Sequence, residues 1–64
     1  MTIREAGKGV VAGGAGTHTY RIGFNGSDET ELDAKNMSDL EELWRSLCPE
    51  FRCKENSVDY VERV

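Results

Sequence analysis

The 64-residue sequence has little material for membrane insertion or redox chemistry: one proline, one histidine and two cysteines. No apolar run is long enough to span a bilayer, and the first residues lack the apolar stretch of a secretory signal. These absences predict a cytoplasmic protein without a membrane span. Cys48 and Cys53 form a C-x4-C spacing, which matches neither the redox C-x-x-C motif nor a tandem zinc pattern, so two reduced thiols are expected. A Cys48–Cys53 bridge across Pro49 stays open, provided that the geometry suits it.

Residues able to carry chemistry are also few. His18, Cys48 and Cys53 supply at most three zinc ligands, whereas a structural zinc site uses four in paired short spacings. Catalysis requires a pocket that excludes water and orients several groups, and so short a chain rarely encloses one. We therefore expect no catalytic residue, metal or cofactor, and interpret His18 as a packed or half-exposed strand residue. A thiol enzyme or zinc protein is retained as a third possibility.

Five of the seven glycines lie within residues 7–16. Gly7-x-Gly9-x-x-Ala12 satisfies a loose dinucleotide-binding fingerprint, but that motif works only between a preceding strand and a helix that starts within it. Residues 3–12 instead favour an irregular or bulged strand, and residues 13–16 favour a loop. The glycines are therefore interpreted as positions where the chain bends.

Residues 17–34 have the pattern of a β-hairpin. His18, Tyr20, Ile22 and Phe24 alternate with more polar residues, and residues 27–34 alternate in the same way after Asn25-Gly26. Placing Tyr20 and Ile22 beside Thr30 and Leu32 requires an odd number of loop residues. We therefore predict a three-residue or bulged turn in which Gly26 has a positive φ.

The next segment predicts an amphipathic helix. Ser38 and Glu41 have the spacing of a capping box, so the helix is expected to begin near Asp39, and Pro49 is expected to end it. Its apolar stripe consists of Leu40, Leu43, Trp44, Leu47 and Cys48, with Trp44 as a core anchor. Beyond it, alternation at Phe51 and Cys53 and the β-rich residues 58–64 favour a C-terminal hairpin, while a short final helix capped by Ser57 stays open.

These elements predict one α+β domain over residues 1–64, with about four antiparallel strands and one amphipathic helix packed on one face of the sheet. The net charge is −4, but it is unevenly spread, because residues 1–21 carry +2 and residues 22–64 carry −6. Such an acidic region repels nucleic acid and anionic membranes and attracts basic protein surfaces.

Seven acidic residues between positions 28 and 42 are opposed there by Lys35 alone. Glu29, Glu31 and Asp33 should share the outer face of their strand, and we expect this face to continue toward the helix acids as one array. The candidate partner-binding residues are Asp28, Glu29, Glu31, Asp33, Asp39, Glu41 and Glu42.

The segment "THTYRIGFNGSDETELDA" followed by "SDLEELWRSL" resembles small acidic anti-CRISPR proteins of phages and mobile elements in element order and charge. The resemblance covers residues 17–48 and implies an inhibitor that acts in the host cytoplasm, for which a monomer is the expected state. It also implies binding to a Cas effector complex, in the basic channel that receives target DNA. No residue role is transferred by position, because these families share little sequence.

Two functions are therefore expected to compete. The first is a non-catalytic inhibitor whose carboxylates mimic the negative charge of DNA on a basic, nucleic-acid-binding surface. The alternative is an assembly module that pairs through an exposed β edge, with a homodimer possible. Val10, Val11 and residues 58–64 are the candidate edges.

Overall fold

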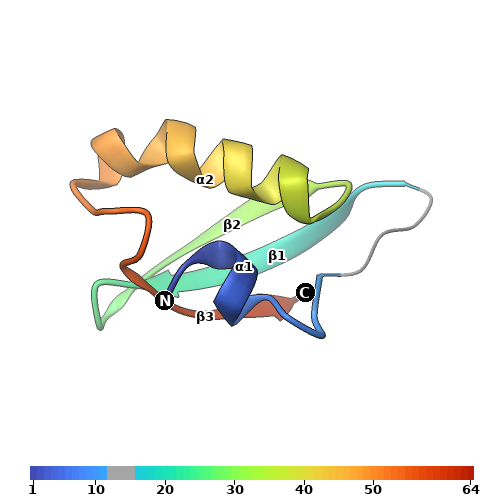
Figure 1. The fold of residues 1–64 in the computed structure, drawn as a ribbon, viewed down its shortest axis with the longest axis horizontal. Coiled ribbons are helices and arrows are strands. Elements are labelled where there is room, and N and C mark those ends of the chain that lie inside the picture. The colour runs from blue at the N-terminus through green and yellow to red at the C-terminus, as the bar shows by residue number, and fades with distance from the viewer. Residues whose placement is uncertain (12–15) are drawn as a thin grey trace.

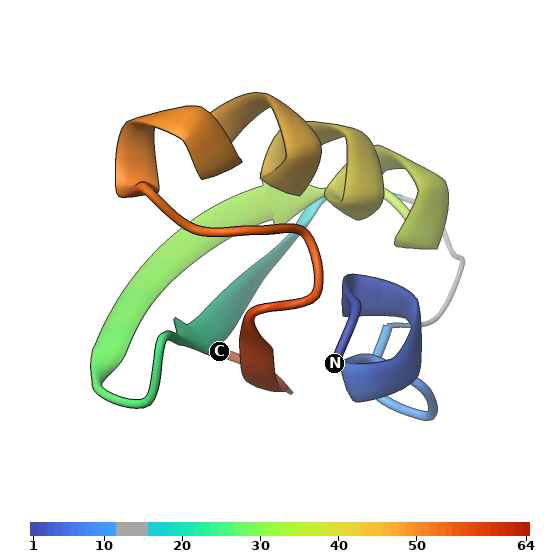
Figure 2. The ribbon, with the colours of Figure 1, turned by 60° about the vertical axis from the view of Figure 1, so that its left-hand side comes forward.

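The computed structural model describes residues 1–11 and 16–64. Its elements are α1 (Ile3–Ala6), β1 (His18–Phe24), β2 (Asp28–Ala34), α2 (Met37–Phe51) and β3 (Val58–Arg63). The strands form an antiparallel sheet in the order β2-β1-β3, and both helices lie over the same face of it (Figures 1 and 2). The α+β class is confirmed, with three strands in place of about four. In the described ranges, no helix is long and apolar enough to cross a membrane.

The central hairpin agrees with the prediction. Tyr20 pairs with Leu32 and Ile22 pairs with Thr30. Phe24 pairs with Asp28, so the turn contains the three residues 25–27, and Gly26 has φ 82°. Asn25, at φ 53°, shares the left-handed region with Gly26. The odd loop length keeps the apolar residues of both strands on one face.

The N-terminal segment was predicted as a strand, and this is wrong. Thr2 and Glu5 form a capping box in which the Thr2 hydroxyl accepts from the Glu5 N–H and the Glu5 carboxylate accepts from the Thr2 N–H. This box starts the one-turn helix α1 and buries Ile3. Val10 and Val11 then donate to the Gly7 carbonyl in a turn. The loop predicted at residues 13–16 lies outside the described residues except for Gly16.

Both predicted ends of the main helix are wrong by a few residues. The N-cap of α2 is Asn36, whose side chain accepts from the Asp39 N–H at 2.9 Å, so Ser38 lies inside the first turn. Pro49 also lies inside the helix, which ends at Phe51 before the left-handed residue Arg52. A proline here removes one hydrogen bond of the final turn, and the N–H groups at the left-handed cap satisfy the carbonyls of Cys48 and Pro49.

The predicted C-terminal hairpin does not form, and the alternative of a final helix is also wrong. Phe51 belongs to α2, and β3 pairs directly with β1 through Ile22–Val61 and Gly23–Tyr60. Asp59 is an extra residue on β3, because Gly23 pairs with Tyr60 while Phe24 pairs with Val58. Single-sequence alternation identified the strand but could not identify its partner.

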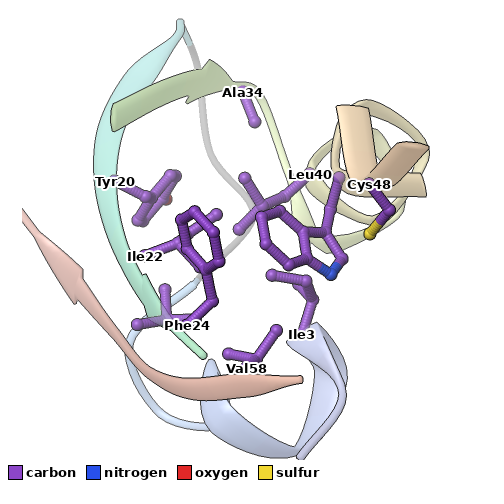
Figure 3. Close-up of a cluster of buried hydrophobic side chains, with 10 residues drawn as sticks. Ile3, Tyr20, Ile22, Phe24, Ala34, Leu40, Cys48 and Val58 are labelled. Atoms are coloured by element: carbon purple, nitrogen blue, oxygen red, sulfur yellow. The ribbon is translucent and has the colours of Figure 1, made fainter. Parts of the chain in front are cut away.

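The core lies between the inner face of the sheet and the two helices (Figure 3). Trp44 is only 2% exposed, and its ring packs edge-on against Phe24 with centroids 5.2 Å apart. Its indole N–H donates to the Glu55 carbonyl at 3.2 Å, so the polar atom of the largest core residue is satisfied. The buried core residues are Ile3, Tyr20, Ile22, Phe24, Ala34, Leu40, Trp44, Cys48, Val58 and Val61.

Candidate functional site: the open face of the sheet

The opposite face of the sheet carries polar and charged side chains and is not covered by either helix. Because side chains alternate along a strand, each strand contributes to this face with the residues that it does not give to the core. We call this surface the open sheet face. It consists of Thr19, Arg21 and Gly23 from β1, Glu29, Glu31 and Asp33 from β2, and Tyr60 and Glu62 from β3.

Each acidic residue that β2 contributes to the open sheet face meets a donor from another strand. Thr19 donates its hydroxyl to Asp33 at 2.6 Å, and Arg21 donates to Glu31 at 3.2 Å. The Tyr60 hydroxyl donates to Glu29 from the far side of β1. The three carboxylates therefore stand in a row with fixed orientations, even though all three residues are exposed.

Arg21 lies at the centre of the open sheet face. Its guanidinium approaches Glu31 at 3.2 Å and Glu62 at 3.6 Å, from β2 and β3 respectively. The hydrogen bond that Arg21 donates to Glu31, together with the charges of the surrounding carboxylates, raises the pKa of Arg21. Four carboxylates against one guanidinium leave this surface clearly negative, because Arg21 can neutralise only part of the charge.

Tyr60 covers the one position of the open sheet face that has no side chain. A Cβ atom built on Gly23 would lie 2.0 Å from the Tyr60 ring, so the ring rests directly on the Gly23 backbone. Gly23 is buried by this contact, while Tyr60 itself remains 36% exposed. The hydrogen bond to Glu29 raises the pKa of the Tyr60 phenol to about 12.

The seven predicted partner-binding residues do not form one continuous array. Glu29, Glu31 and Asp33 share the open sheet face as expected, whereas Asp28 pairs with the inward-facing Phe24 and takes the other side of the strand. The helix acids lie beyond the core, because α2 packs on the inner face. The sheet therefore separates the strand acids from the helix acids.

The helix acids also have local structural roles. Asp39 accepts from the Lys35 N–H at 3.0 Å, beside the Asn36 cap. Glu41 forms an ion pair with Arg4 at 2.5 Å, which links α2 to α1. Glu42 is exposed on α2. Asp39 and Glu41 thus stabilise the fold and are weak candidates for partner contacts.

Sequence reasoning missed the contribution of β3 to the site. Glu62 and Tyr60 join the open sheet face because β3 pairs with β1, opposite Arg21 and Gly23. Alternation within residues 58–63 predicts that Tyr60 and Glu62 share one face of the strand. It does not predict that they lie opposite Gly23 and Arg21, because that depends on the β1–β3 pairing and on the bulge at Asp59. Arg21 was recognised only as a polar residue of its strand.

A small cavity of about 130 Å³ lies on the inner side of the molecule, between α1, α2 and the loop before β3. It is lined by Thr2, Ile3, Glu41, Trp44, Arg45 and Glu55. Its polar groups are largely engaged in the capping box, the Trp44 hydrogen bond and an ion pair of 2.9 Å between Arg45 and Glu55. Within residues 1–11 and 16–64, no three His, Cys, Asp or Glu side chains converge as metal ligands.

Comparison of the chain with protein-family models, with curated proteins and with solved structures finds no match. The functional argument therefore rests on the residues of the open sheet face.

Proposed function

We propose that this chain is a non-catalytic binding domain that presents its open sheet face to a basic protein surface. The observation that carries the proposal is the ordered row of carboxylates on β2, extended across Arg21 to Glu62 on β3. Partner lysines and arginines would bind these carboxylates, and the association would be accelerated by the opposite charges. No chemical step is required of the domain.

The spacing of the row suggests that the partner surface normally binds nucleic acid. Alternate residues of a strand lie about 6.7 Å apart, which is close to the separation of successive phosphates along a nucleic-acid strand. Glu29, Glu31 and Asp33 are each held by a cross-strand donor, so little side-chain entropy is lost when they bind. The domain would then inhibit its partner by competing with nucleic acid.

The resemblance of residues 17–48 to small acidic anti-CRISPR proteins supplies the finer proposal. In that case, the partner is a Cas effector complex, and the open sheet face occupies the basic channel that receives target DNA. Glu29, Glu31 and Asp33 are the acidic residues of the resembling segment that lie on the open sheet face, whereas the acids of α2 face away from it.

The test is a competition experiment with a purified Cas effector complex and a labelled target duplex. The chain should displace the duplex, and its affinity should fall steeply as salt is raised. Reversing two charges of the row with Glu29→Lys and Glu31→Lys should weaken binding by about tenfold or more, because close interfacial charge pairs carry large coupling energies.

The matched control makes the same change in charge on the other side of the molecule. Glu42→Lys with Glu50→Lys alters two exposed residues of α2 and should leave affinity within about threefold, since distant charges act only through a screened field. Circular dichroism checks that both double variants are folded. Affinity that is insensitive to salt and to both pairs of substitutions would refute the proposal.

A second candidate function is assembly through the edge of β3. The large hydrophobic residues that are exposed in the described ranges are Met1, Tyr60 and Val64, at 53%, 36% and 61%, and all lie on or beside β3. Met1 occupies the start of this edge by exchanging hydrogen bonds with Val58 at 2.9 and 3.0 Å. Val10 and Val11, the other predicted edge, lie in a turn. Two copies could pair along the rest of β3.

Light scattering at micromolar concentration distinguishes this function from the first. The Val64 N–H donates to Thr19 on β1, so by alternation the Arg63 N–H points to the outer edge. Arg63→Pro should therefore block edge pairing without breaking the β1–β3 ladder, and Arg63→Ala is the matched control. A dimer that only Arg63→Pro dissociates supports assembly, whereas a wild-type monomer contradicts it.

A further inference from the structure

The C-terminal end of α2 brings the two cysteines together. Arg52 adopts the left-handed conformation, and its N–H donates to the Pro49 carbonyl at 3.3 Å. The Cys53 N–H donates to the Cys48 carbonyl at 3.1 Å. These two hydrogen bonds define a Schellman motif, in which the side chains of the first and sixth residues contact each other. Here those two residues are Cys48 and Cys53.

The backbone hydrogen bond limits how far apart the two cysteines can be. The path from the Cys53 Cα through its N–H and the Cys48 carbonyl to the Cys48 Cα is at most about 7.3 Å long, given standard bond lengths. The bond angle at the Cys48 carbonyl carbon lowers this limit to about 7 Å, and bending at the Cys53 nitrogen shortens the separation further. Disulfides join Cα atoms that are roughly 4.4–6.8 Å apart, so the backbone already has a suitable spacing.

The two thiols differ in accessibility. Cys48 is 5% exposed at the end of the apolar stripe, whereas Cys53 is half-buried and its Sγ lies 3.8 Å from the Cys48 carbonyl oxygen. Burial, and then the neighbouring Cys53 thiol, raise the pKa of Cys48. A reaction with an external reagent should therefore begin at Cys53.

We propose that Cys48 and Cys53 are a modification site that closes to an intramolecular disulfide across the cap of α2. The oxidant is a low-molecular-weight disulfide of the glutathione type. The Cys53 thiolate attacks one sulfur of glutathione disulfide, forming a mixed disulfide and releasing one glutathione thiolate. Cys48 then loses its proton and attacks the Cys53 sulfur, which releases the second glutathione. The two protein thiols lose two electrons, and glutathione disulfide is reduced to two glutathione molecules.

The disulfide would stabilise the part of the chain that holds Trp44. The segment that follows the cap carries Glu55, whose carbonyl accepts the Trp44 indole N–H. Phe51, just before the cap, packs against Trp44 with ring centroids 6.0 Å apart. A covalent closure of Cys48–Cys53 restricts this segment in the unfolded chain, while the folded chain already has the required backbone hydrogen bond.

The experiment equilibrates the full chain with glutathione redox buffers and follows it by intact mass and thiol alkylation. The wild type should lose two hydrogens and two alkylatable thiols while remaining a monomer. The same equilibrium in urea should be less favourable by about tenfold or more, because folding and the disulfide stabilise each other. The melting temperature of the oxidised form should be higher than that of the reduced form by about 5–10 °C.

Two variants identify the order of the steps. Cys48→Ala should stop at a stable glutathione adduct on Cys53, and Cys53→Ser should react much more slowly and show no redox-dependent melting temperature. If Cys48→Ala does not fold, the comparison of disulfide formation by the wild type in buffer and in urea still tests the proposal. A stable glutathione adduct on the wild type, disulfide-linked dimers, or equal equilibria in buffer and urea would overturn the proposal.

Discussion

The two faces of the sheet are built from the same three strands, yet they differ in almost every physical property. The inner face contributes Tyr20, Ile22 and Val61 to a core sealed by two helices. The outer face carries carboxylates, Arg21 and Tyr60, and no described element covers it. The comparison separates the residues that fold the domain from those that are available for recognition.

The energetic weights of the two faces are also unequal. Removing a large core side chain costs about 2–5 kcal/mol. An exposed ion pair such as Arg21–Glu31 contributes far less, because water and salt screen its charges. A cluster of like charges on the open sheet face is therefore not explained by stability. This difference is the physical reason for assigning recognition to that face, and the following experiments test it from the largest expected effect to the smallest.

Trp44→Ala should have the largest effect. It leaves a cavity where the ring contacts Phe24 and Phe51, and it removes the hydrogen bond to the Glu55 carbonyl. We expect a loss of about 3–5 kcal/mol, which is most of the stability of a domain this small. Urea denaturation followed by far-ultraviolet circular dichroism measures it.

Glu31→Ala on the outer face is the control for Trp44→Ala, and it should change the free energy of unfolding by less than about 1 kcal/mol. Equal losses for the two variants would contradict the division between the faces.

The inner face was largely predictable from the sequence because it follows from local periodicity. Alternation in residues 17–34 gave the hairpin, and the need to keep Tyr20 and Leu32 on one face gave the three-residue turn. The stripe of α2 placed Trp44 in the core. These patterns repeat over many residues, so one misleading position does not change the conclusion.

The outer face was only half predictable because it depends on pairings between distant segments. The row on β2 followed from alternation, but Tyr60 and Glu62 reach it through the β1–β3 register and a bulge at Asp59. Short capping signals were misjudged as well. The capping box of Thr2 and Glu5 starts a helix in a segment whose β-branched residues had predicted a strand. The N-cap of α2 is Asn36, two residues before the predicted cap Ser38.

Gly23→Ala should disturb the outer face while leaving the core intact. The new Cβ atom would clash with the Tyr60 ring, so the ring must move and give up its contact with Glu29. We expect a loss of about 1–2 kcal/mol. In a Tyr60→Ser background, the same substitution should be neutral or stabilising, because alanine suits a strand better than glycine. A double-mutant cycle in urea measures the coupling, and additive effects would contradict the contact.

Thr2→Ala should destabilise α1, which packs on the inner face of the sheet, because it removes the side-chain half of the capping box. The expected loss is about 1 kcal/mol, since the Glu5 N–H loses its acceptor and Ile3 is held less firmly. Two hydrogen bonds lower the pKa of Glu5 in the folded chain: the larger effect comes from the Thr2 backbone N–H, which the variant keeps, and the smaller from the Thr2 hydroxyl, which it loses. The contribution of the hydroxyl bond is present above the ordinary Glu range and is lost as pH falls. The difference between wild type and variant should therefore narrow in acid. A difference that is constant with pH would show that the Thr2 hydroxyl does not bind the Glu5 carboxylate.

The smallest effect concerns the alkaline titration of Tyr60. Its hydrogen bond to Glu29 raises the folded-state pKa to about 12, above the ordinary value of about 10 for an unfolded chain. The stabilisation from this contact is therefore complete below pH 10 and is lost as pH rises toward 12. Phenolate absorbance should show this late transition, Tyr60→Phe should remove it, and Glu29→Gln should move it back toward the ordinary pKa. If Glu29→Gln leaves the transition in place, the phenol is not held by that carboxylate, and the row on β2 lacks its cross-strand support at this end.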